Sequence, residues 1–226
     1  MMRKGMPGSF ADVSVVMATR DEEAAVAGTI EDIRRAVQGE AEILIVDGSA
    51  DRTPEIAEET GVRVIRQAPA GYGVALREGL LAAKGKIIVT MDCDDTYPAE
   101  AIPELVLRVR EGYDVAGGSR LMQDNPAMKG FNRFGNLLLS RLASALYGAH
   151  ISDVTTGMRA YRREIIHGTT WTENTGLSAE LLIRPIQQGC RVTEIPISYR
   201  ARKGTTKLRP IRGGLSILKS IIKCRF

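Results

Sequence analysis

Short apolar runs rich in β-branched residues recur along the chain at intervals of roughly 20 to 30 residues. Runs of this length, bounded by polar and glycine-containing segments, are typical of buried strands. The pattern predicts strands at Val13–Met17, Ile43–Val46, Val62–Ile65, Ile87–Met91 and Val115–Gly117.

Segments with helical periodicity lie between these runs. Prolines at positions 54 and 98 fit the first turns of two helices, and glycines at 39, 61, 85 and 112 fit helix ends. Alternating strands and helices favour βαβ units, so the expected fold class is α/β, with a Rossmann-like, mostly parallel central sheet and flanking helices. The predicted helices are Glu22–Val37, Pro54–Glu59, Val74–Ala83 and Ala99–Arg110.

The alternation changes after Arg120. A polar loop, helix, strand, helix and strand are predicted at Met122–Gly130, Asn132–Tyr147, Thr156–Arg162, Ser178–Gln188 and Arg191–Ile197. A chain of 226 residues is long enough for one such domain. We expect an N-terminal leader over residues 1–12, a single domain over 13–210 and a C-terminal helix over 211–226.

Charge is distributed unevenly. Nine of the 31 Lys and Arg residues, and none of the 27 Asp and Glu residues, lie from Tyr199 onward, which indicates an anionic partner at this end of the chain. Aromatic residues make up only 5%, which argues against nucleic-acid binding. Three cysteines without CxxC spacing favour a reducing, cytoplasmic setting.

The C-terminal helix is expected to be amphipathic and basic. On a helical wheel, one arc is apolar and the opposite arc carries lysine and serine. Such a helix is typical of a peripheral contact on the cytoplasmic face of a membrane, but an ordinary helix packed on the domain gives the same pattern. The apolar arc consists of Leu215, Ile217, Leu218, Ile221 and Ile222.

Carboxylates follow two of the predicted strands. Asp47 ends the second strand, and Asp92 and Asp94 follow the fourth. Ligands of open α/β sheets bind at the carboxyl ends of strands, and two close carboxylates repel each other unless a cation lies between them. Mg²⁺ or Mn²⁺, bound to carboxylates and substrate phosphates, fits this pattern. Acidic turns that cap the following helices would also explain these residues.

Five segments together resemble the family 2 glycosyltransferases of the GT-A fold, and most of all the dolichol-phosphate mannosyltransferase group. The segments are VSVVMATRDEE, ILIVDGSADRT, GYGVALREGLLAAKGKIIVTMDCDDTYP, VAGGSR and SDVTTGMRAYRRE, which occur in the family's order. The resemblance runs from about Val13 to Lys207. It implies a metal-dependent, inverting transfer of a hexose from a nucleotide-sugar, such as GDP-mannose or UDP-glucose, to a polyprenyl (dolichyl) phosphate.

The resemblance also implies residue roles on the donor side. Asp92 would approach the sugar or ribose and the metal, and Asp94 would bind the metal. Thr96 replaces the glutamine that many relatives use as a third ligand, and the first loop departs from the family's usual Pro-Ala-Tyr-Asn-Glu. The residues expected to bind the nucleotide are Ala18, Thr19, Arg20, Glu22, Asp47 and Asp92.

On the acceptor side, a phosphate is already an anionic nucleophile at neutral pH and needs positioning by cations rather than a base. The resemblance places Arg120, Arg133 and Arg202 at this phosphate, and Lys207, in the same basic loop as Arg202, is expected there too. Arg120 is counted among the catalytic residues beside Asp92 and Asp94. If the acceptor were a hydroxyl, Asp153 or Glu180 could act as the base. The expected sugar pocket comprises Asp153, Thr156, Gly157 and Glu180.

Three alternatives remain open at this stage. A transferase with a soluble acceptor, such as a sugar or phosphoglycerate, would use the same site. A nucleotidyltransferase would also place carboxylates and a metal beside a nucleotide, although the first loop lacks the glycines that such enzymes usually carry. A binding module without activity is the third.

Overall fold

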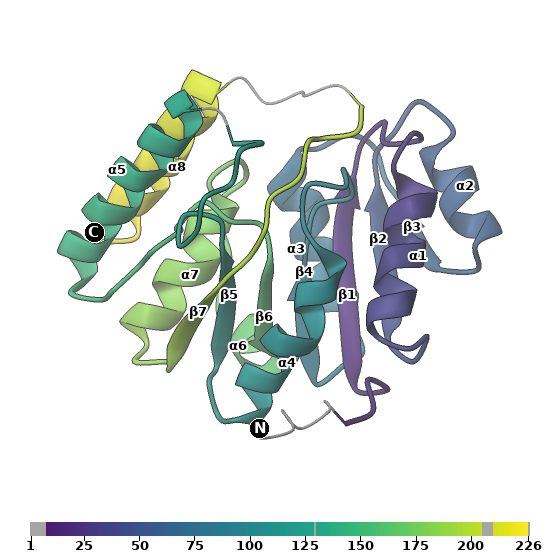
Figure 1. The fold of residues 1–226 in the computed structure, drawn as a ribbon, viewed down its shortest axis with the longest axis horizontal. Helices are drawn as coiled ribbons and strands as arrows, with labels where there is room; N and C mark the ends of the chain where they lie inside the picture. Colours follow the sequence, from purple (N-terminus) through teal and green to yellow (C-terminus); the bar gives the residue numbers. More distant parts are fainter. Residues whose placement is uncertain (1–7, 129, 205–209, 226) are drawn as a thin grey trace.

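The computed structural model describes residues 8–128, 130–204 and 210–225, without the side chains of residues 210 and 211. Within these ranges seven strands form one sheet in the order β3-β2-β1-β4-β6-β5-β7 (Figure 1). All neighbouring strands are parallel except at β6, which is antiparallel to both β4 and β5. The strands are β1 Val13–Thr19, β2 Glu42–Asp47, β3 Arg63–Arg66, β4 Ile87–Thr90, β5 Val115–Ser119, β6 Arg159–Arg162 and β7 Val192–Pro196.

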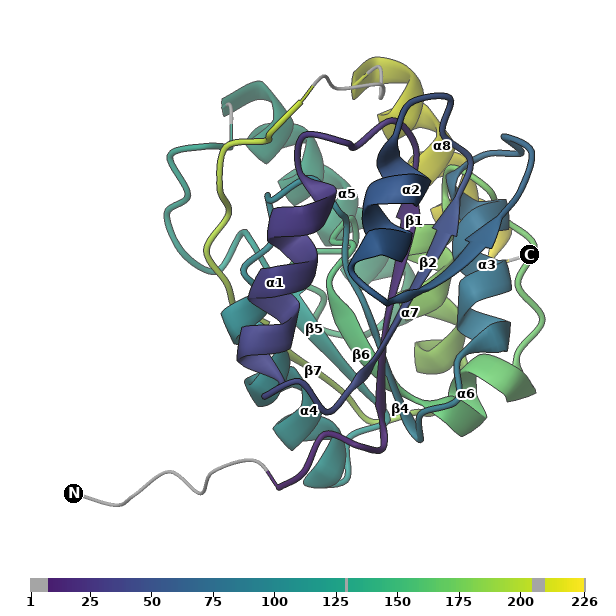
Figure 2. The same ribbon diagram turned by 90° about the vertical axis from the view of Figure 1, so that its right-hand side faces the viewer.

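Helices cover both faces of the sheet (Figures 1 and 2). The helices α1, α2 and α4 share an apolar core with one face, and α3, α6 and α7 share a core with the other. The helices α5 and α8 pack side by side and both contact α7. The bounds are α1 Val26–Ala36, α2 Thr53–Glu59, α3 Tyr72–Ala82, a 3₁₀ turn Ala99–Ala101, α4 Ile102–Arg110, α5 Gly130–Tyr147, α6 Arg163–Gly168, α7 Leu177–Gln187 and α8 Pro210–Lys223.

The central strand β1 is apolar on both faces because helices cover both. Val13, Val15 and Met17 point into the core beneath α1 and α4, whereas Val16 points into the core beneath α3. Alternation of side chains along a strand produces this division, and burial on both sides explains why the run lacks a polar face. None of these four side chains is exposed.

The α/β fold class and the mostly parallel sheet are confirmed. The strand predicted at Thr156–Arg162 is shorter and runs antiparallel, and the helix predicted from Glu22 begins at Val26, after a turn at residues 23–25. The short helix α6 was not predicted. Gly39, Gly61 and Gly112 have the positive φ angles of helix ends. Gly85 instead lies against the start of β1, where an added Cβ would come 2.5 Å from the backbone nitrogen of Ser14.

None of the helices described here has the length and apolar character needed to cross a bilayer. The predicted leader lies mostly outside the described residues.

Helix α3 packs closely on the sheet through Gly79. A Cβ at this position would lie 2.5 Å from Cγ1 of Val16, whereas Gly28 in α1 is exposed and has nothing within 4 Å. We expect Gly79→Ala to lower the free energy of unfolding by about 1–3 kcal/mol through overpacking. The matched substitution Gly28→Ala should raise it by about 0.5–1 kcal/mol, because only helix propensity changes. Urea denaturation measures both, and equal effects of the two changes would contradict this packing.

Candidate functional site

The carboxyl ends of β1, β2, β4 and β5 meet at one edge of the sheet, because these four strands run in the same direction. Thr19 and Asp47 close β1 and β2, Asp92 follows β4, and Arg120 follows β5. The antiparallel strand β6 begins at this edge, so Gly157, just before it, lies opposite Asp92. The edge therefore gathers most of the predicted site residues.

The first and second loops are bound to each other. The buried carboxylate of Asp47 accepts hydrogen bonds from Thr19 Oγ1 at 2.6 Å and from the backbone nitrogen of Ser49 at 2.9 Å. The backbone nitrogens of Asp21 and Glu22 donate to Ser49 Oγ and Thr53 Oγ1. The predicted nucleotide residues 18–22 thus form a braced loop in which Ala18 is half-buried and Arg20 is exposed.

Asp92 is a half-buried acid whose charge is only partly compensated by its neighbours. Burial raises its pKa to about 7, the charge of Asp94 adds to this rise, and the hydroxyl of Tyr72, which donates to Oδ1 at 3.1 Å, opposes it. Burial and the charge of Asp92 also raise the pKa of Tyr72, so this hydroxyl stays protonated. A Cβ at Gly157 would lie 3.2 Å from both carboxylate oxygens of Asp92, so glycine leaves that side of the acid open.

The loop that carries Tyr72 is held by Asn174. Its Oδ1 accepts from the backbone nitrogen of Gly73 at 2.8 Å, and its Nδ2 donates to the carbonyl of Ala70 at 3.1 Å. Side chains at positions 71 and 73 would collide with Asn174, which explains the glycines that flank Tyr72. Neither Tyr72 nor Asn174 was predicted as a site residue, although the Gly71-Tyr72-Gly73 sequence marks a close approach of this kind.

Glu180 braces the same region. Its buried carboxylate accepts hydrogen bonds from the backbone nitrogens of Thr172 and Glu173 and from Arg184 Nε at 2.6 Å. These contacts hold the loop that contains Asn174. Because both oxygens are engaged, this position fits a structural role better than that of a base or a sugar ligand.

Asp94 is held by Thr96 on one side and by Arg202 on the other. Oδ1 accepts from Thr96 Oγ1 at 2.6 Å and from the Thr96 nitrogen at 3.1 Å, and Oδ2 accepts from Arg202 Nη1 at 2.5 Å. Arg202 Nη2 also binds Glu22. Thr96 therefore orients Asp94, a role that the sequence comparison with glutamine-bearing relatives did not suggest.

Arg202 belongs to residues 197–204, the strap segment, which leaves β7 and crosses the edge of the sheet (Figure 1). Within the strap segment, the backbone nitrogens of Arg200 and Lys203 donate to the carbonyls of Thr96 and Asp94 at 2.9 and 3.0 Å, respectively. Arg200 and Lys203 also pair with Asp95. The basic strap segment thus lies along the acidic turn that follows β4.

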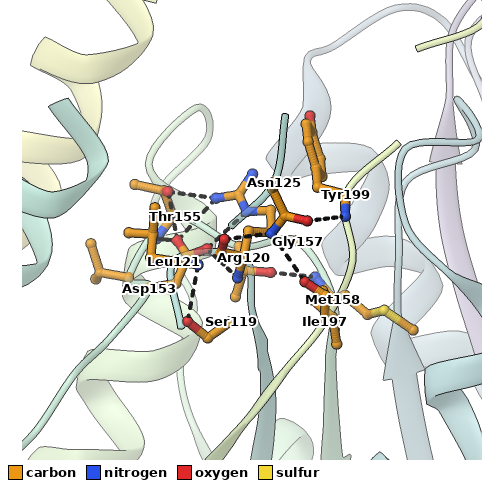
Figure 3. Close-up of polar contacts among 12 residues, drawn as sticks. Ser119, Arg120, Leu121, Asn125, Asp153, Thr155, Gly157, Met158, Ile197 and Tyr199 are labelled. Carbon is orange, nitrogen blue, oxygen red and sulfur yellow. Dashed lines mark hydrogen bonds and ion pairs between the residues drawn. The ribbon is translucent and has the colours of Figure 1, made fainter. Parts of the chain in front are cut away.

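Arg120 and Asp153 form a buried ion pair (Figure 3). Nε and Nη2 of Arg120 donate to the two carboxylate oxygens at 2.8 and 2.9 Å, and Nη2 also donates to Thr155. The guanidinium lies 5.7 and 5.3 Å from the ring centres of Tyr97 and Tyr199. Nη1 has no hydrogen-bond partner in the described part of the chain and is the nitrogen through which Arg120 could meet an anion.

The remaining predicted positions are less central. Thr156 is buried in the turn before β6, where its Oγ1 accepts from the nitrogen of Met158. Arg133 lies near the start of α5, donates to the carbonyl of Gln123 at 3.2 Å and pairs with Asp124 at 3.7 Å. Lys207 lies outside the described residues.

The chemistry of Asp92 and Asp94 fits a divalent cation. Asp94 is buried and Asp92 is half-buried, and burial together with the charge of Asp94 raises the pKa of Asp92 despite the nearby arginines. The described residues contain no cluster of three or more His, Cys, Asp and Glu side chains that could hold a metal. Water and substrate phosphate oxygens would have to complete the shell, as is usual for Mg²⁺.

Three comparisons with known proteins agree. Residues 14–169 match the model of glycosyl transferase family 2. A dolichyl-phosphate hexose transferase of Haloferax volcanii is 53% identical over 95% of this chain and 94% of its own length. A dolichol-phosphate mannosyltransferase of Pyrococcus furiosus is 31% identical over 87% of this chain and 59% of its own length.

Among solved structures, glucosyl-3-phosphoglycerate synthase from Mycobacterium tuberculosis, in complex with Mn²⁺, UDP and phosphoglyceric acid, superposes with a TM-score of 0.76. It is 23% identical, and the match covers 94% of this chain and 78% of that one. The similarity supports the GT-A fold.

The Arg120–Asp153 pair makes a specific prediction about stability. Asp153→Asn leaves the buried guanidinium without its counter-charge, so we expect the free energy of unfolding at pH 7 to fall by about 3–5 kcal/mol. Asp124→Asn, which changes a fully exposed carboxylate, should alter it by less than about 0.5 kcal/mol. A cost below about 1 kcal/mol for Asp153→Asn would contradict the pairing.

The pH dependence of that cost follows from the pKa of Asp153. Burial by itself raises this pKa, but the charge and hydrogen bonds of Arg120 outweigh burial, and the net pKa is lowered. The stabilisation is therefore complete above the unfolded pKa of about 3.9 and is lost as pH falls through the lower folded value. Urea denaturation between neutral and acidic pH should show the difference between Asp153→Asn and wild type shrinking below about pH 4.

Proposed function

Because the chain belongs to glycosyl transferase family 2, we propose that it transfers a hexose from a nucleotide-sugar to a polyprenyl phosphate of the dolichyl type. The 53% identity to a dolichyl-phosphate hexose transferase, over nearly the full length of both chains, supports this acceptor. Sugar transfer is favoured over nucleotidyl transfer by the family, and a module without activity is disfavoured by the carboxylates gathered at the sheet edge.

One observation in the structure favours a phosphate acceptor over a hydroxyl. The two carboxylates that could have served as a base, Asp153 and Glu180, are both engaged by hydrogen bonds and ion pairs within the domain. A phosphate acceptor requires no base because it is already an anion at neutral pH. Arg120 Nη1 and the strap segment would position it.

In the proposed reaction a phosphate oxygen attacks the anomeric carbon as the bond to the nucleoside diphosphate breaks, so the configuration inverts. Asp92 and Asp94 would hold Mg²⁺ or Mn²⁺, which supplies positive charge to the departing diphosphate. Thr96 fixes the orientation of Asp94, and Tyr72 fixes that of Asp92. The braced loop at residues 18–22 and Asp47 would bind the nucleoside.

We further propose that α5 and α8 contact the membrane. Phe131, Phe134 and Leu138 follow the spacing of one helix face in α5 and are 70, 68 and 59% exposed. In α8, Leu215 and Ile222 of the predicted apolar arc are also exposed, whereas Ile221 is buried against the domain. Part of this apolar arc therefore packs against the domain, and part of it is exposed to solvent. Exposed apolar side chains with nearby arginine and lysine are typical of peripheral membrane contact on an anionic, cytoplasmic leaflet.

A groove of about 600 Å³ beside α5 supports the same acceptor. Leu121, which follows Arg120 in the chain, lines it together with Leu137 and Ile151, and Arg141 and His150 also contribute. Ser140, Ser144, Ala145 and Ser152 complete the lining. The apolar part of this groove would accommodate part of a polyprenyl chain whose phosphate lies at Arg120.

A donor panel tests the proposed reaction. GDP-mannose, UDP-glucose and UDP-N-acetylglucosamine are each incubated with Mg²⁺ or Mn²⁺ and either a short polyprenyl phosphate or 3-phosphoglycerate. We expect a lipid-linked hexose with at least one donor and loss of product with a chelator. Asp94→Asn should slow transfer by roughly a hundredfold or more, since even outer-shell partners of a metal contribute up to about that factor. Product formed on 3-phosphoglycerate but on no lipid would refute the lipid acceptor.

Vesicle binding tests the membrane contact. Phe134→Asn should weaken sedimentation with anionic phospholipid vesicles by roughly tenfold, because one large apolar side chain no longer leaves water. Leu81→Asn is the matched control, since Leu81 is 54% exposed but lies on α3, on another part of the surface. Equal binding of the two variants would argue against α5 as the contact.

A further inference from the structure

The two oxygens of Asp94 are in different situations. Oδ1 accepts two hydrogen bonds from Thr96, which uses both of its acceptor positions. Oδ2 accepts from Arg202 Nη1 at 2.5 Å. A metal ion bound to Asp94 would therefore have to use Oδ2, the oxygen that the guanidinium already contacts.

Sharing this oxygen would place two cations side by side in a partly buried site. The side chain of Arg202 is 26% exposed and that of Asp94 is 8% exposed, so water screens the repulsion only in part. Arg202 also binds Glu22 through Nη2, and this second contact keeps the guanidinium over the site. Metal and guanidinium are thus competitors for Asp94.

Once displaced from Asp94, Arg202 could bind an anion. Its Nε is buried and has no hydrogen-bond partner among the described residues, so the side chain has donor capacity to spare. The strap segment also passes Arg120, since Tyr199 lies against the guanidinium of Arg120. Arg120 itself is neutralised by Asp153, so net positive charge for an anionic acceptor has to come from another residue.

We propose that Arg202 is a displaceable counter-ion of Asp94: the metal–donor complex takes over Asp94 Oδ2, and the released guanidinium turns to the phosphate of the acceptor. The second half of this statement rests on the proposed function, whereas the competition for Asp94 does not. Two ligands whose sites are linked in this way affect each other reciprocally. The metal–nucleotide complex should therefore strengthen acceptor binding, and the acceptor should strengthen binding of the metal–nucleotide complex by the same factor.

Binding of Mn²⁺ alone, followed by electron paramagnetic resonance of the free ion, tests the competition. Arg202→Gln should tighten Mn²⁺ binding about fivefold, since an ion pair of this exposure is broken when the metal binds to wild type. Arg200→Gln is the matched control: it removes the same charge from the strap segment, but Arg200 pairs with Asp95 and Glu100 rather than Asp94. That variant should change the affinity by less than about twofold.

Arg202→Lys provides a second variant in case Arg202→Gln folds poorly, which thermal denaturation would reveal. A lysine keeps the charge but cannot bridge Asp94 and Glu22 with two nitrogens, so Mn²⁺ affinity should lie between those of wild type and Arg202→Gln. If Arg202→Gln, correctly folded, binds Mn²⁺ no more tightly than Arg200→Gln does, the competition is refuted.

The link to the acceptor is tested with a short-chain polyprenyl phosphate in titration calorimetry. In wild type, saturating Mn²⁺ with GDP or UDP should tighten binding of the polyprenyl phosphate several-fold. In Arg202→Gln this enhancement should vanish. An equal enhancement in both proteins would overturn the transfer of Arg202 to the phosphate. If Arg202→Gln does not bind Mn²⁺ more tightly than Arg200→Gln but the enzyme glycosylates the lipid, this inference is refuted and the proposed function stands. If Arg202→Gln does bind Mn²⁺ more tightly but no sugar is transferred, the competition stands and the proposed function is refuted.

Discussion

The accumulation of carboxylates at one edge of the sheet is the constraint on which the site depends. Asp92 and Asp94 follow β4, and Glu22 approaches them from the first loop by way of Arg202. Like charges in a protected environment must be compensated, or one of them must take up a proton, and burial, followed by the charge of Asp94, raises the pKa of Asp92. The basic strap segment, the hydroxyl of Tyr72 and the closed turn at Thr96 all follow from this requirement.

A second series of contacts runs from α8 to the same acids. Ser220 in α8 donates to the carbonyl of Gly176, where an added Cβ would collide with Ser220. The loop that contains Gly176 also carries Asn174, which fixes the backbone on either side of Tyr72, and Tyr72 donates to Asp92. The helix proposed to contact the membrane is thus packed against the loop that orients the Asp92 carboxylate, so loss of this helix would disturb more than lipid binding.

The fold was predictable from the sequence where the signals are local. The candidate site was predictable where its residues directly follow strands. Alternating apolar runs located most of the strands, and the position of Asp47, Asp92 and Asp94 at one edge was predictable because parallel strands place their ends together. The direction of β6 was not predictable, because its short sequence carries no information about which edge it enters. Tyr72 and Asn174 were missed for a similar reason: Asn174 lies 101 residues from Gly73, and Arg202 lies 108 residues from Asp94. Such pairings depend on the folded chain, and no spacing rule reveals them.

The distribution of charge also bears on which nucleophile the site can use. With Asp153 and Glu180 engaged, Asp92, whose pKa burial raises to about 7, is a carboxylate that could accept a proton from a hydroxyl acceptor at neutral pH. Its basicity arises from burial and from the neighbouring charge of Asp94, and the charge of a bound cation would outweigh both causes by favouring the ionised form. The same carboxylate cannot hold a metal for the donor and remain a strong base for the acceptor. An acceptor that arrives already ionised avoids this conflict, and Arg120, which follows β5, and the arginines of the strap segment would meet it.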